Sequence, residues 1–460
     1  MQAYQICGGK TRGGPFGNGV NSARMVDETG RSWTRMLAAA TLALVLVLAL
    51  LGCNAPEPSI PEDSTDDVTG PGWWNLRRPG RTADALTAEQ LAEAERLASL
   101  GYVSGSIEPA TEDVVTLHDR ERTWAGLNLY NSGHAPEAFL VDMEGNVIHR
   151  WGYRFADAWP EAPLDEVPDN MKDWWRRVHL LENGELLAIF EGVGLIKLDR
   201  DSNLLWERNI GAHHDLQVLP DGRIVVLARS IGVVPSVHPT EATLEDYILV
   251  LDESGKVLQR VSLLKSFERE GFDFRSPDGQ EHHPDVFHTN TVAVLDGRIA
   301  DRVPEFAAGH VLVSMRTLDR IAVVDLERER VVWTRTGTFK QQHDPRILAN
   351  GNLLLFDNTG RPEQSSVQEY DPSSMELVWE YRGTEDQPFY SEWCGTAQRL
   401  PNGNTLITES DYGRAFEVTA TGEIVWEYFN PHRAGEGGRY IARLLELVRL
   451  PPDFPVDWSN

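Results

Sequence analysis

The sequence predicts an all-β fold, a six-bladed β-propeller, and three observations support this prediction. A strand that ends in a glycine turn and continues into a more apolar strand recurs along the chain. Each such pair is followed by a second pair of strands around another turn. These four-strand units recur at roughly 40–50 residues, which is typical of propeller blades. A pair of β-sandwiches or a solenoid is the alternative, but a sandwich would not repeat the same turn chemistry in register.

The first pair of each unit is recognised five times by its glycine turn, and these turns predict tight hairpins. The five segments are "VHLLENGELLAIF" (178–190), "HDLQVLPDGRIVVLAR" (214–229), "HTNTVAVLDGR" (288–298), "HDPRILANGNLLLFDN" (343–358) and "GTAQRLPNGNTLITES" (395–410).

The second pair of each unit follows, as in 247–261, 321–335, 366–381 and 415–428. An early pair at 138–151 lacks a clear innermost strand, while the C-terminal "LELVRLPPD" (445–453) resembles "LQVLPDG" and "AQRLPNG". We therefore expect Leu445–Leu450 to return and close the first blade, which removes two exposed sheet edges. Tryptophans recur at matching places in the second pairs: Trp206, Trp333, Trp379 and Trp426.

The chain before the repeats divides into three segments. In residues 1–53 a basic stretch precedes the apolar run Met36–Leu51 and the residues Leu-Leu-Gly-Cys, which resembles a bacterial lipoprotein signal cut before a lipidated Cys53. A transmembrane anchor is the alternative, but the run is short for a span of about 20 residues. Met25 and Met36 are alternative starts. We expect a membrane-anchored lipoprotein of the cell envelope that faces the periplasm or the exterior.

The remaining boundaries follow from composition. Residues 54–84 are rich in proline, glycine and acidic residues and read as a disordered tether. Residues 85–123 contain a predicted helix that starts with the capping box Thr87 to Gln90, and a lead-in. The propeller is expected over 124–455. Two long connections inside it, 153–177 and 263–287, are expected to be lids or binding loops.

The charge balance limits the partners. The formal charge is 43 − 70 = −27, which argues against nucleic-acid binding because that requires a basic surface. An anionic ligand would need a local positive site. Of the three cysteines, Cys394 has no partner if Cys53 is lipidated, so no internal disulfide is expected. The oligomeric state is left open.

Three blades are expected to place a histidine at the start of their innermost strand. His214 and His343 each lie eight residues before the turn glycine of their hairpin, and His288 lies nine before its own. Such positions should converge at one mouth of the central channel. A single histidine at a strand start is usually structural, but recurrence at matching register favours a shared site.

Charged residues accompany these histidines. Asp215 and Asp344 follow two of them and could orient a ring or cap the strand, and Arg361 follows the hairpin of His343 and is expected to turn back toward it. Three imidazoles and a guanidinium would form a local anion site. "EHHPDVFH" (281–288) offers His282, His283, Asp285 and His288 to a metal, but its spacing fits no strong motif. The sequence therefore predicts neither a metal nor a cofactor.

Two segments carry a resemblance to a known family. "QHDPRILANGNLLLFDNTGR" and "CGTAQRLPNGNTLITESDYGRAFEVTATGEIVWEYFNP" resemble the bacterial arylsulfotransferases, over about residues 120–455. The resemblance implies a six-bladed propeller that moves a sulfuryl group from an aryl sulfate to a phenol without a nucleotide donor. It implies a sulfohistidine intermediate, with further histidines and an arginine on the sulfuryl oxygens. His343 and Arg361 match the family's His–Arg pair, and His214 and His288 match histidines on earlier inner strands.

One departure from the family limits this interpretation. The family's nucleophilic histidine lies on the inner strand of a late blade, where this chain has Gly395 beside Cys394. Another histidine could take the nucleophile's role, a Cys394 thiolate could do so, or the chain could only bind its ligand. Two hypotheses remain: a tethered sulfotransferase that uses His214, His288, His343 and Arg361, or a non-catalytic propeller that binds or scaffolds at the cell envelope.

Overall fold

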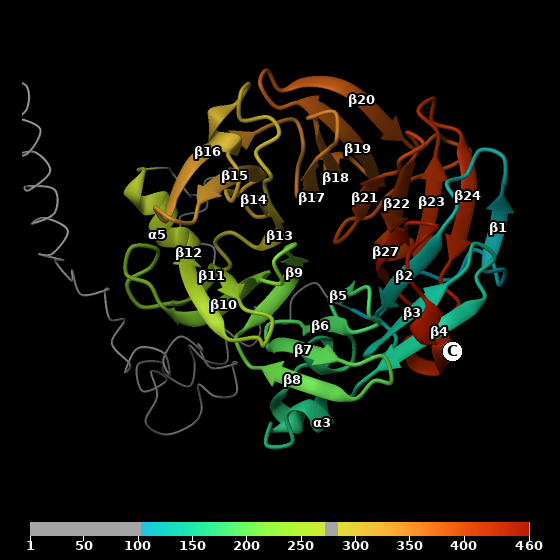
Figure 1. Ribbon diagram of the computed structural model, residues 1–460, viewed down its shortest axis with the longest axis horizontal. Coiled ribbons are helices and arrows are strands. Elements are labelled where there is room, and N and C mark those ends of the chain that lie inside the picture. Colours follow the sequence, from blue (N-terminus) through green and yellow to red (C-terminus); the bar gives the residue numbers. More distant parts are fainter. Residues whose placement is uncertain (1–102, 272–283, 460) are drawn as a thin grey trace, which may run out of the picture. The chain divides into compact units, whose positions relative to one another are not determined.

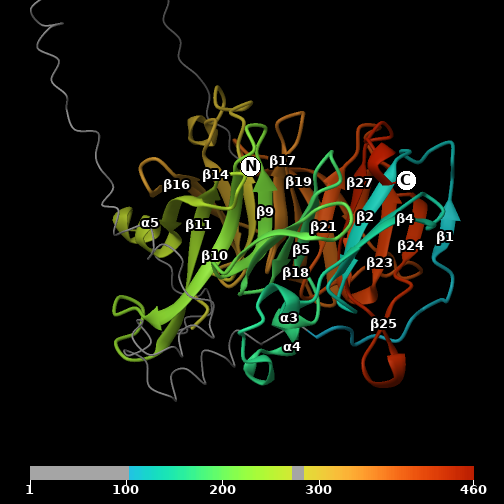
Figure 2. The same cartoon turned by 60° about the horizontal axis from the view of Figure 1, so that its bottom comes forward.

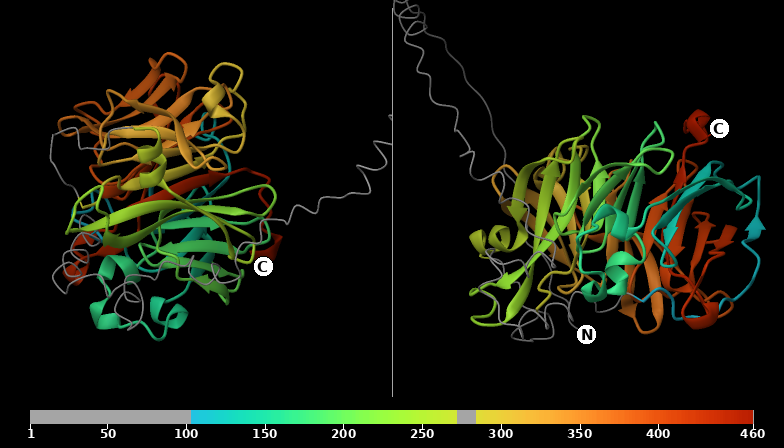
Figure 3. Two further views of the ribbon diagram at one scale, coloured as in Figure 1. Left: turned by 90° about the vertical axis from the view of Figure 1, so that its left-hand side faces the viewer. Right: turned by 90° about the horizontal axis from the view of Figure 1, so that it is seen from below.

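Six antiparallel sheets surround a central axis in the structure, a computed structural model that describes residues 103–271 and 284–459 (Figure 1). The predicted six-bladed β-propeller is confirmed. The expected signal segment, Cys53, the tether and the helix after it lie outside the described residues, as do His282 and His283. Figure 3, which views the ring from two sides, shows the blades standing next to one another, with their strands running across the thickness of the ring.

In each blade the strands are ordered from the axis outward. Blade 1 has β27 (Leu444–Leu450), β2 (Leu127–Ser132), β3 (Glu137–Val141) and β4 (Val147–Gly152); blade 2 has β5 (Arg177–Leu180), β6 (Leu186–Phe190), β7 (Gly194–Leu198) and β8 (Leu204–Arg208); blade 3 has β9 (Ala212–Val218), β10 (Ile224–Val233), β11 (Ala242–Leu251) and β12 (Val257–Ser262).

The second half of the ring has the same order. Blade 4 has β13 (Thr289–Val294), β14 (Val311–Met315), β15 (Arg320–Asp325) and β16 (Arg330–Thr336); blade 5 has β17 (His343–Ile347), β18 (Leu353–Arg361), β19 (Gln364–Asp371) and β20 (Glu376–Arg382); blade 6 has β21 (Thr396–Arg399), β22 (Thr405–Glu409), β23 (Arg414–Val418) and β24 (Ile424–Phe429), with β1 (Val115–His118) as a fifth, outermost strand.

Strand β27 closes the ring. It pairs antiparallel with β2, from Leu127 opposite Leu450 to Ser132 opposite Leu444, and so supplies the innermost strand of a blade whose other strands lie more than 290 residues earlier. This is the place that the sequence analysis expected the C-terminal segment to take. Because β1 also pairs with β24, both ends of the described chain are held in sheets that include residues from the opposite end.

The core lies between neighbouring blades, and the alternation of each strand explains why. Successive side chains of a strand point to opposite faces. In β18, Leu353 and Leu355 pack toward blade 4 while Leu354 and Phe356 pack toward blade 6, and all four are fully buried. The short apolar runs that the sequence shows are therefore strands buried on both faces.

Tryptophans of the fourth strands of blades 1, 5 and 6 bond to the following blade. Trp151 donates a hydrogen bond from Nε1 to the carbonyl of Gly184 at 3.1 Å, Trp379 to Ala420 at 2.9 Å, and Trp426 to Met143 at 3.0 Å. The acceptor lies in the following blade, for Trp151 in the turn between the first and second strands and for Trp379 and Trp426 in the turn between the third and fourth strands. The repeated tryptophans thus serve blade packing.

The long connections carry the helices. Residues 153–177 include α3 (Phe155–Ala158), α4 (Asp169–Lys172) and the 3-10 turn η4 (Leu164–Glu166), and α5 (Leu263–Arg269) packs against blades 3 and 4. Figure 2 shows α3, α4 and the small sheet β25–β26 at one end of the ring. None of the helices in the described part of the chain is long and apolar enough to cross a membrane. The smaller elements are η5 (Pro304–Phe306), η6 (Ser410–Tyr412), β25 (Arg433–Ala434), η7 (Glu436–Gly438), β26 (Tyr440–Ile441) and η8 (Asp457–Ser459).

Candidate functional site

The innermost strands bring the three predicted histidines together at one end of the ring. The rings of His214 and His288 meet edge to face, with their centroids 4.9 Å apart. His343 is near enough for the charge of His288 to lower its pKa. His214 and His343 are buried and His288 is partly exposed. His214 and His288 have positive φ angles of 55° and 46°, a conformation that is uncommon for non-glycine residues and clusters at functional sites.

Arg176 occupies the same place in blade 2. It lies eight residues before Gly184, as His214 lies eight before Gly222 and His343 eight before Gly351. Its side chain is buried, and its charge lowers the pKa of both His214 and His343. Arg176 was not predicted, because only the histidines at this register were considered as candidates.

The second strands contribute polar residues at a constant position. Seven residues after the turn glycines at 184, 222, 309 and 351 come, respectively, Glu191, Arg229, Arg316 and Asn358. Glu191 and Arg316 come directly after the second strands β6 and β14, and Arg229 and Asn358 lie within the second strands β10 and β18. At this common position the second strand lies beside the start of the innermost strand, which carries the histidines. The spacing of seven residues after a turn glycine can be read from the sequence, so these four residues could have been predicted from it.

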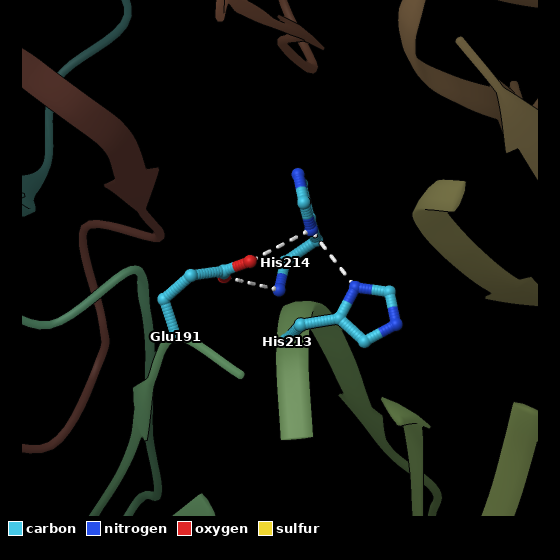
Figure 4. A group of neighbouring side chains, drawn as sticks. All are labelled: Glu191, His213 and His214. Atoms are coloured by element: carbon cyan, nitrogen blue, oxygen red, sulfur yellow. Dashed lines mark hydrogen bonds and ion pairs between the residues drawn. The ribbon is translucent and has the colours of Figure 1, made fainter. Parts of the chain in front are cut away.

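Glu191, His213 and His214 form a buried chain of contacts (Figure 4). The Nδ1 atoms of the two histidines are 2.9 Å apart, and His214 Nδ1 is also 3.3 Å from Glu191 Oε1. The other carboxylate oxygen accepts a hydrogen bond from the backbone N–H of His214 at 3.0 Å. Glu191 therefore fixes both the backbone and the ring of His214.

The same three residues could hold a metal ion, because one donor atom from each lies within 4.8 Å of the others and imidazole and carboxylate are zinc ligands. Arg229 argues against this use. Its Nη2 lies 3.1 Å from Glu191 Oε1, so the carboxylate already has a cationic partner. We interpret the group as a hydrogen-bonded chain that orients His214.

His343 is held in one tautomer. Its Nδ1 faces two acceptors, the carbonyl of Gln341 at 3.0 Å and Oδ1 of Asn358 at 2.8 Å. Asn358 cannot present its amide nitrogen instead, because that nitrogen donates to the carbonyls of Ser391 and Cys394 at 2.7 and 2.9 Å. Nδ1 therefore carries the proton and Nε2 the lone pair. Nε2 is buried and has no hydrogen-bond partner among the described residues.

His288 is held by a carboxylate. Asp285 Oδ2 lies 2.5 Å from His288 Nδ1, and Oδ1 accepts the backbone N–H of His288 at 3.0 Å. A second carboxylate is close by, since burial and the charge of Asp285 raise the pKa of Asp246 to about 7. Asp246 Oδ1 lies 3.5 Å from His213 Nε2, which links the two histidine groups.

Burial and nearby arginines keep this group of histidines neutral. Burial lowers the pKa of His213, His214 and His343 well below the ordinary value of 6.5. Positive charges lower it further, mainly from Arg229 at His213, Arg176 at His214 and Arg316 at His343. Neutral imidazoles beside fixed guanidinium groups combine free nitrogen lone pairs with a positive potential.

The predicted aspartates have another role. Asp215 accepts the backbone N–H of Val292 in the next blade at 3.0 Å, and Asp344 that of Ala397 at 3.1 Å. Both also bind arginines along the axis: Arg346 lies 3.0 Å from Asp215 and 2.9 Å from Asp344. The two aspartates thus join neighbouring innermost strands.

Arg361 is not part of the buried group. It is exposed and pairs with Gln364 at the tip of the β18–β19 hairpin, five residues beyond Phe356, the partner of His343. The expectation that Arg361 turns back to His343 is therefore not met. The arginines whose charges lower the pKa of His343 are Arg316 and Arg176.

The other side of this end of the ring is apolar. Trp174, Cys394 and Leu445 pack together with the partly buried Trp393. Arg316 joins the two sides, since its Cζ lies 4.8 Å above the Trp393 ring and its Nη2 donates to Gln341 Oε1 at 2.6 Å. Cys394 is a free, buried thiol.

Gly395 leaves no room for a side chain. Its φ is +149°, and a Cβ atom there would come within 2.5–2.6 Å of the Phe356 ring. A histidine at this position would have to displace a fully buried phenylalanine. The departure from the family pattern is therefore built into the packing.

Comparison with known families now gives this geometry a context. The model of the arylsulfotransferase (ASST) family matches residues 177–431, more than half of the chain. The chain belongs to the arylsulfotransferase family. The match covers blades 2 to 6, which carry the buried histidines, and it begins one residue after Arg176.

Solved structures resemble this chain in fold only. A protein of unknown function from Bacteroides caccae shares 13% identity, with a TM-score of 0.46, over 70% of this chain and 98% of that one. Virginiamycin B lyase from Staphylococcus aureus shares 11% identity, with a TM-score of 0.34, over 57% and 74%. BamB from Moraxella catarrhalis shares 12% identity, with a TM-score of 0.31, over 69% and 77%. A search of curated proteins found no match.

Proposed function

We propose that this protein transfers a sulfuryl group from an aryl sulfate to a phenolic acceptor, through a histidine at the end of the ring where the innermost strands begin. One observation carries the proposal: neutral, buried imidazoles are gathered among the fixed cations Arg176, Arg229 and Arg316. A histidine must be neutral to attack sulfur, and a sulfuryl group needs positive charge around its oxygens.

The chemistry suits this environment. An aryl sulfate brings one negative charge, which the arginines can balance in a site with little water. Its leaving group is a phenolate, which needs little help from an acid, so neutral histidines suffice. The imidazole holds the sulfuryl group between the departure of one phenol and the arrival of the next. The reaction splits one transfer into two displacements at sulfur.

The apolar side supports an aryl substrate. Trp393 is partly buried, and Cζ of Arg316 lies 4.8 Å from the centroid of its ring. The aryl ring of a donor whose sulfuryl oxygens contact Arg316 could pack against this tryptophan, since aromatic rings associate edge to face or offset.

Release of a chromogenic phenol from nitrophenyl sulfate in the presence of a second phenol tests the proposal. We expect turnover that depends on the acceptor. His343→Asn should lower the rate at least about 10²-fold, comparable with the loss of an oxyanion donor. His149→Asn, on the outermost strand β4, is the matched control and should keep the rate. Acceptor-independent hydrolysis, or equal loss in both variants, would contradict the proposal.

A non-catalytic role is the second candidate, and Gly395 favours it. The position at which the family carries its nucleophile accepts no side chain, while the arginines that would bind an anionic ligand are still present. A binding module would take up the aryl sulfate in calorimetry but release no phenol over hours. Such binding without turnover would replace the first proposal with the second.

We also propose that Cys53 carries a lipid that tethers the propeller to a membrane of the cell envelope, facing the periplasm or the exterior. The lipoprotein-like signal before Cys53 supports this proposal, and two or more acyl chains anchor stably. Cys53→Ala should yield an uncut precursor or a soluble protein in membrane fractionation. A processed, membrane-bound Cys53→Ala protein would rule out this anchor.

A further inference from the structure

Of the buried histidines, we infer that His288 is the nucleophile of the proposed reaction and that Asp285 is its positioning residue; this inference rests on the proposed function. The late-blade position cannot serve, because a side chain at Gly395 would collide with Phe356. The nucleophile must therefore come from the histidines of earlier blades, and their surroundings differ.

His288 lies close to the other histidines of the group. Its ring is 4.9 Å from that of His214, and its charge lowers the pKa of His213, His214 and His343 alike. A sulfuryl group on His288 would thus lie among all the other histidines and near the arginines that act on them.

His288 is also the accessible member. Its side chain is 14% exposed, while those of His213 and His214 are each 1% exposed, and His343 as a residue is 3% exposed. A donor and an acceptor as large as substituted phenols must both reach the reacting nitrogen. This requirement disfavours the more deeply buried rings.

Asp285 prepares the ring for attack. Its bond to Nδ1, 2.5 Å long, places the proton on that atom, so the lone pair resides on Nε2. The carboxylate also stabilises the positive charge that develops on the ring when Nε2 bonds to sulfur. The second oxygen of Asp285 holds the His288 backbone at φ +46°, which fixes the direction of the ring.

The step balances without another reactant. The Nε2 lone pair forms an N–S bond as the S–O bond to the donor aryl group breaks, and the electron pair leaves with the phenolate. The acceptor oxygen then bonds to sulfur, and the N–S electron pair returns to Nε2. The donor phenolate takes a proton from solvent as it departs, and the acceptor phenol gives up its own proton in the second step, so no net proton is consumed. In this scheme His343, whose lone pair is on Nε2, takes the proton of the acceptor and returns it to solvent.

Labelling and peptide mapping test the assignment. Trypsin places the candidates in separate peptides: His213 and His214 in 209–223, His288 in 276–298, and His343 in 341–346. Full-length protein would be incubated with [35S]nitrophenyl sulfate without acceptor, quenched at alkaline pH, digested and mapped. We expect the label in 276–298, and fragmentation should place it on His288 and not on His282 or His283.

Variants complete the test. His288→Asn should abolish the label and lower transfer at least about 10³-fold, as is usual for a nucleophile, with an unchanged melting temperature. His343→Asn should slow transfer but keep the label. Asp285→Asn should lower kcat at least about 10-fold with little change in KM, and Asp285→Glu should restore part of it.

Each outcome decides a separate question. Label in 209–223 or 341–346, or transfer in wild type without any label, would overturn the assignment to His288 while leaving a sulfotransferase. No transfer and no label from any aryl sulfate would overturn the proposed function, and this inference with it.

Discussion

Arg449 of the closing strand β27 and Glu417 of blade 6 form an ion pair, with 3.1 Å between Arg449 Nη1 and Glu417 Oε2, and both side chains are completely buried. Glu417 also accepts the backbone N–H of Trp124 at 2.8 Å. Three parts of the chain that lie far apart in sequence therefore meet at this pair, where the ring closes.

Arg449→Met should destabilise the protein by about 3–5 kcal/mol, because it leaves the Glu417 carboxylate buried without a cation. Arg439→Met is the control: Arg439 pairs with Glu108 at 2.9 Å, but both side chains are about two-thirds exposed, so the loss should stay below about 1 kcal/mol. Urea unfolding measures both. Similar losses in the two variants would mean that closure does not depend on the buried pair.

Gly395→Ala should cost more stability than Gly403→Ala. Both glycines have positive φ, but a Cβ at Gly403 meets open space whereas one at Gly395 meets the Phe356 ring at 2.5 Å. We expect the substitution at Gly403 to lower the free energy of unfolding by about 1 kcal/mol through backbone strain. At Gly395 we expect a further loss of about 1–3 kcal/mol through overpacking. Combining Gly395→Ala with Phe356→Leu should recover about 1 kcal/mol relative to additivity. Additive effects would place the strain elsewhere.

Arg316→Met should move the acid limb of the pH–rate profile to higher pH. After burial, Arg316 is the main cause of the lowered pKa of His343. Removing this cation favours the protonated ring, so the pKa rises and the neutral fraction falls at a given acidic pH. We expect transfer at pH 5.5 to fall relative to pH 8 in this variant. Arg335→Met, on the outer strand of the same blade, should leave the profile unchanged.

His432 should contribute to acid lability. Burial and His134, whose ring stacks on it at 3.6 Å, lower the pKa of His432 to about 4. Between pH 6.5 and 4 the unfolded chain binds a proton at His432 that the folded protein does not, so stability falls as the pH drops. From pH 7.5 to 5, His432→Gln should lose about 2 kcal/mol less stability than the wild type, because the pH drops about 1.5 units below the unfolded pKa at about 1.4 kcal/mol per unit. An equal change in His149→Gln would contradict this assignment.

The repeat made most of the fold predictable. Five of the six blades can be recognised by a glycine turn between apolar runs. The "LPPD" ending identified the strand that closes the remaining blade, because it resembles the innermost strands of other blades. The same register located His214, His288 and His343. Local patterns were sufficient here because the blades pack in the same way and therefore repeat the same spacing of strands and turns.

Arg361 shows where such reasoning stops. A bulge between Asp357 and Arg361 interrupts the pairing of β18 with β19, and Asp357 binds the backbone N–H groups of Lys340 and Gly360. These contacts fix the tip of the hairpin, where Arg361 is exposed and does not fold back toward His343. They depend on a residue of another segment, Lys340, so spacing within the hairpin could not reveal them. Asp285 was considered only as a possible metal ligand, an interpretation that the sequence did not favour, and its role as the partner of the His288 ring was not predicted.

The arrangement of β1 and β27 governs the order in which this chain can fold during its synthesis. Blades 2 to 5 are each made of one continuous stretch and can form as soon as that stretch has left the ribosome. Blade 1 must wait for β27, and β1 for β24, whose residue Tyr428 pairs with Val115. Until the last few dozen residues have been made, the nascent chain therefore carries an incomplete ring with a sheet edge open at each end. Contacts between strands that lie far apart in sequence form slowly. Open sheet edges can meanwhile pair with strands of other chains. A nascent chain of this design depends on protection from aggregation up to its final strand.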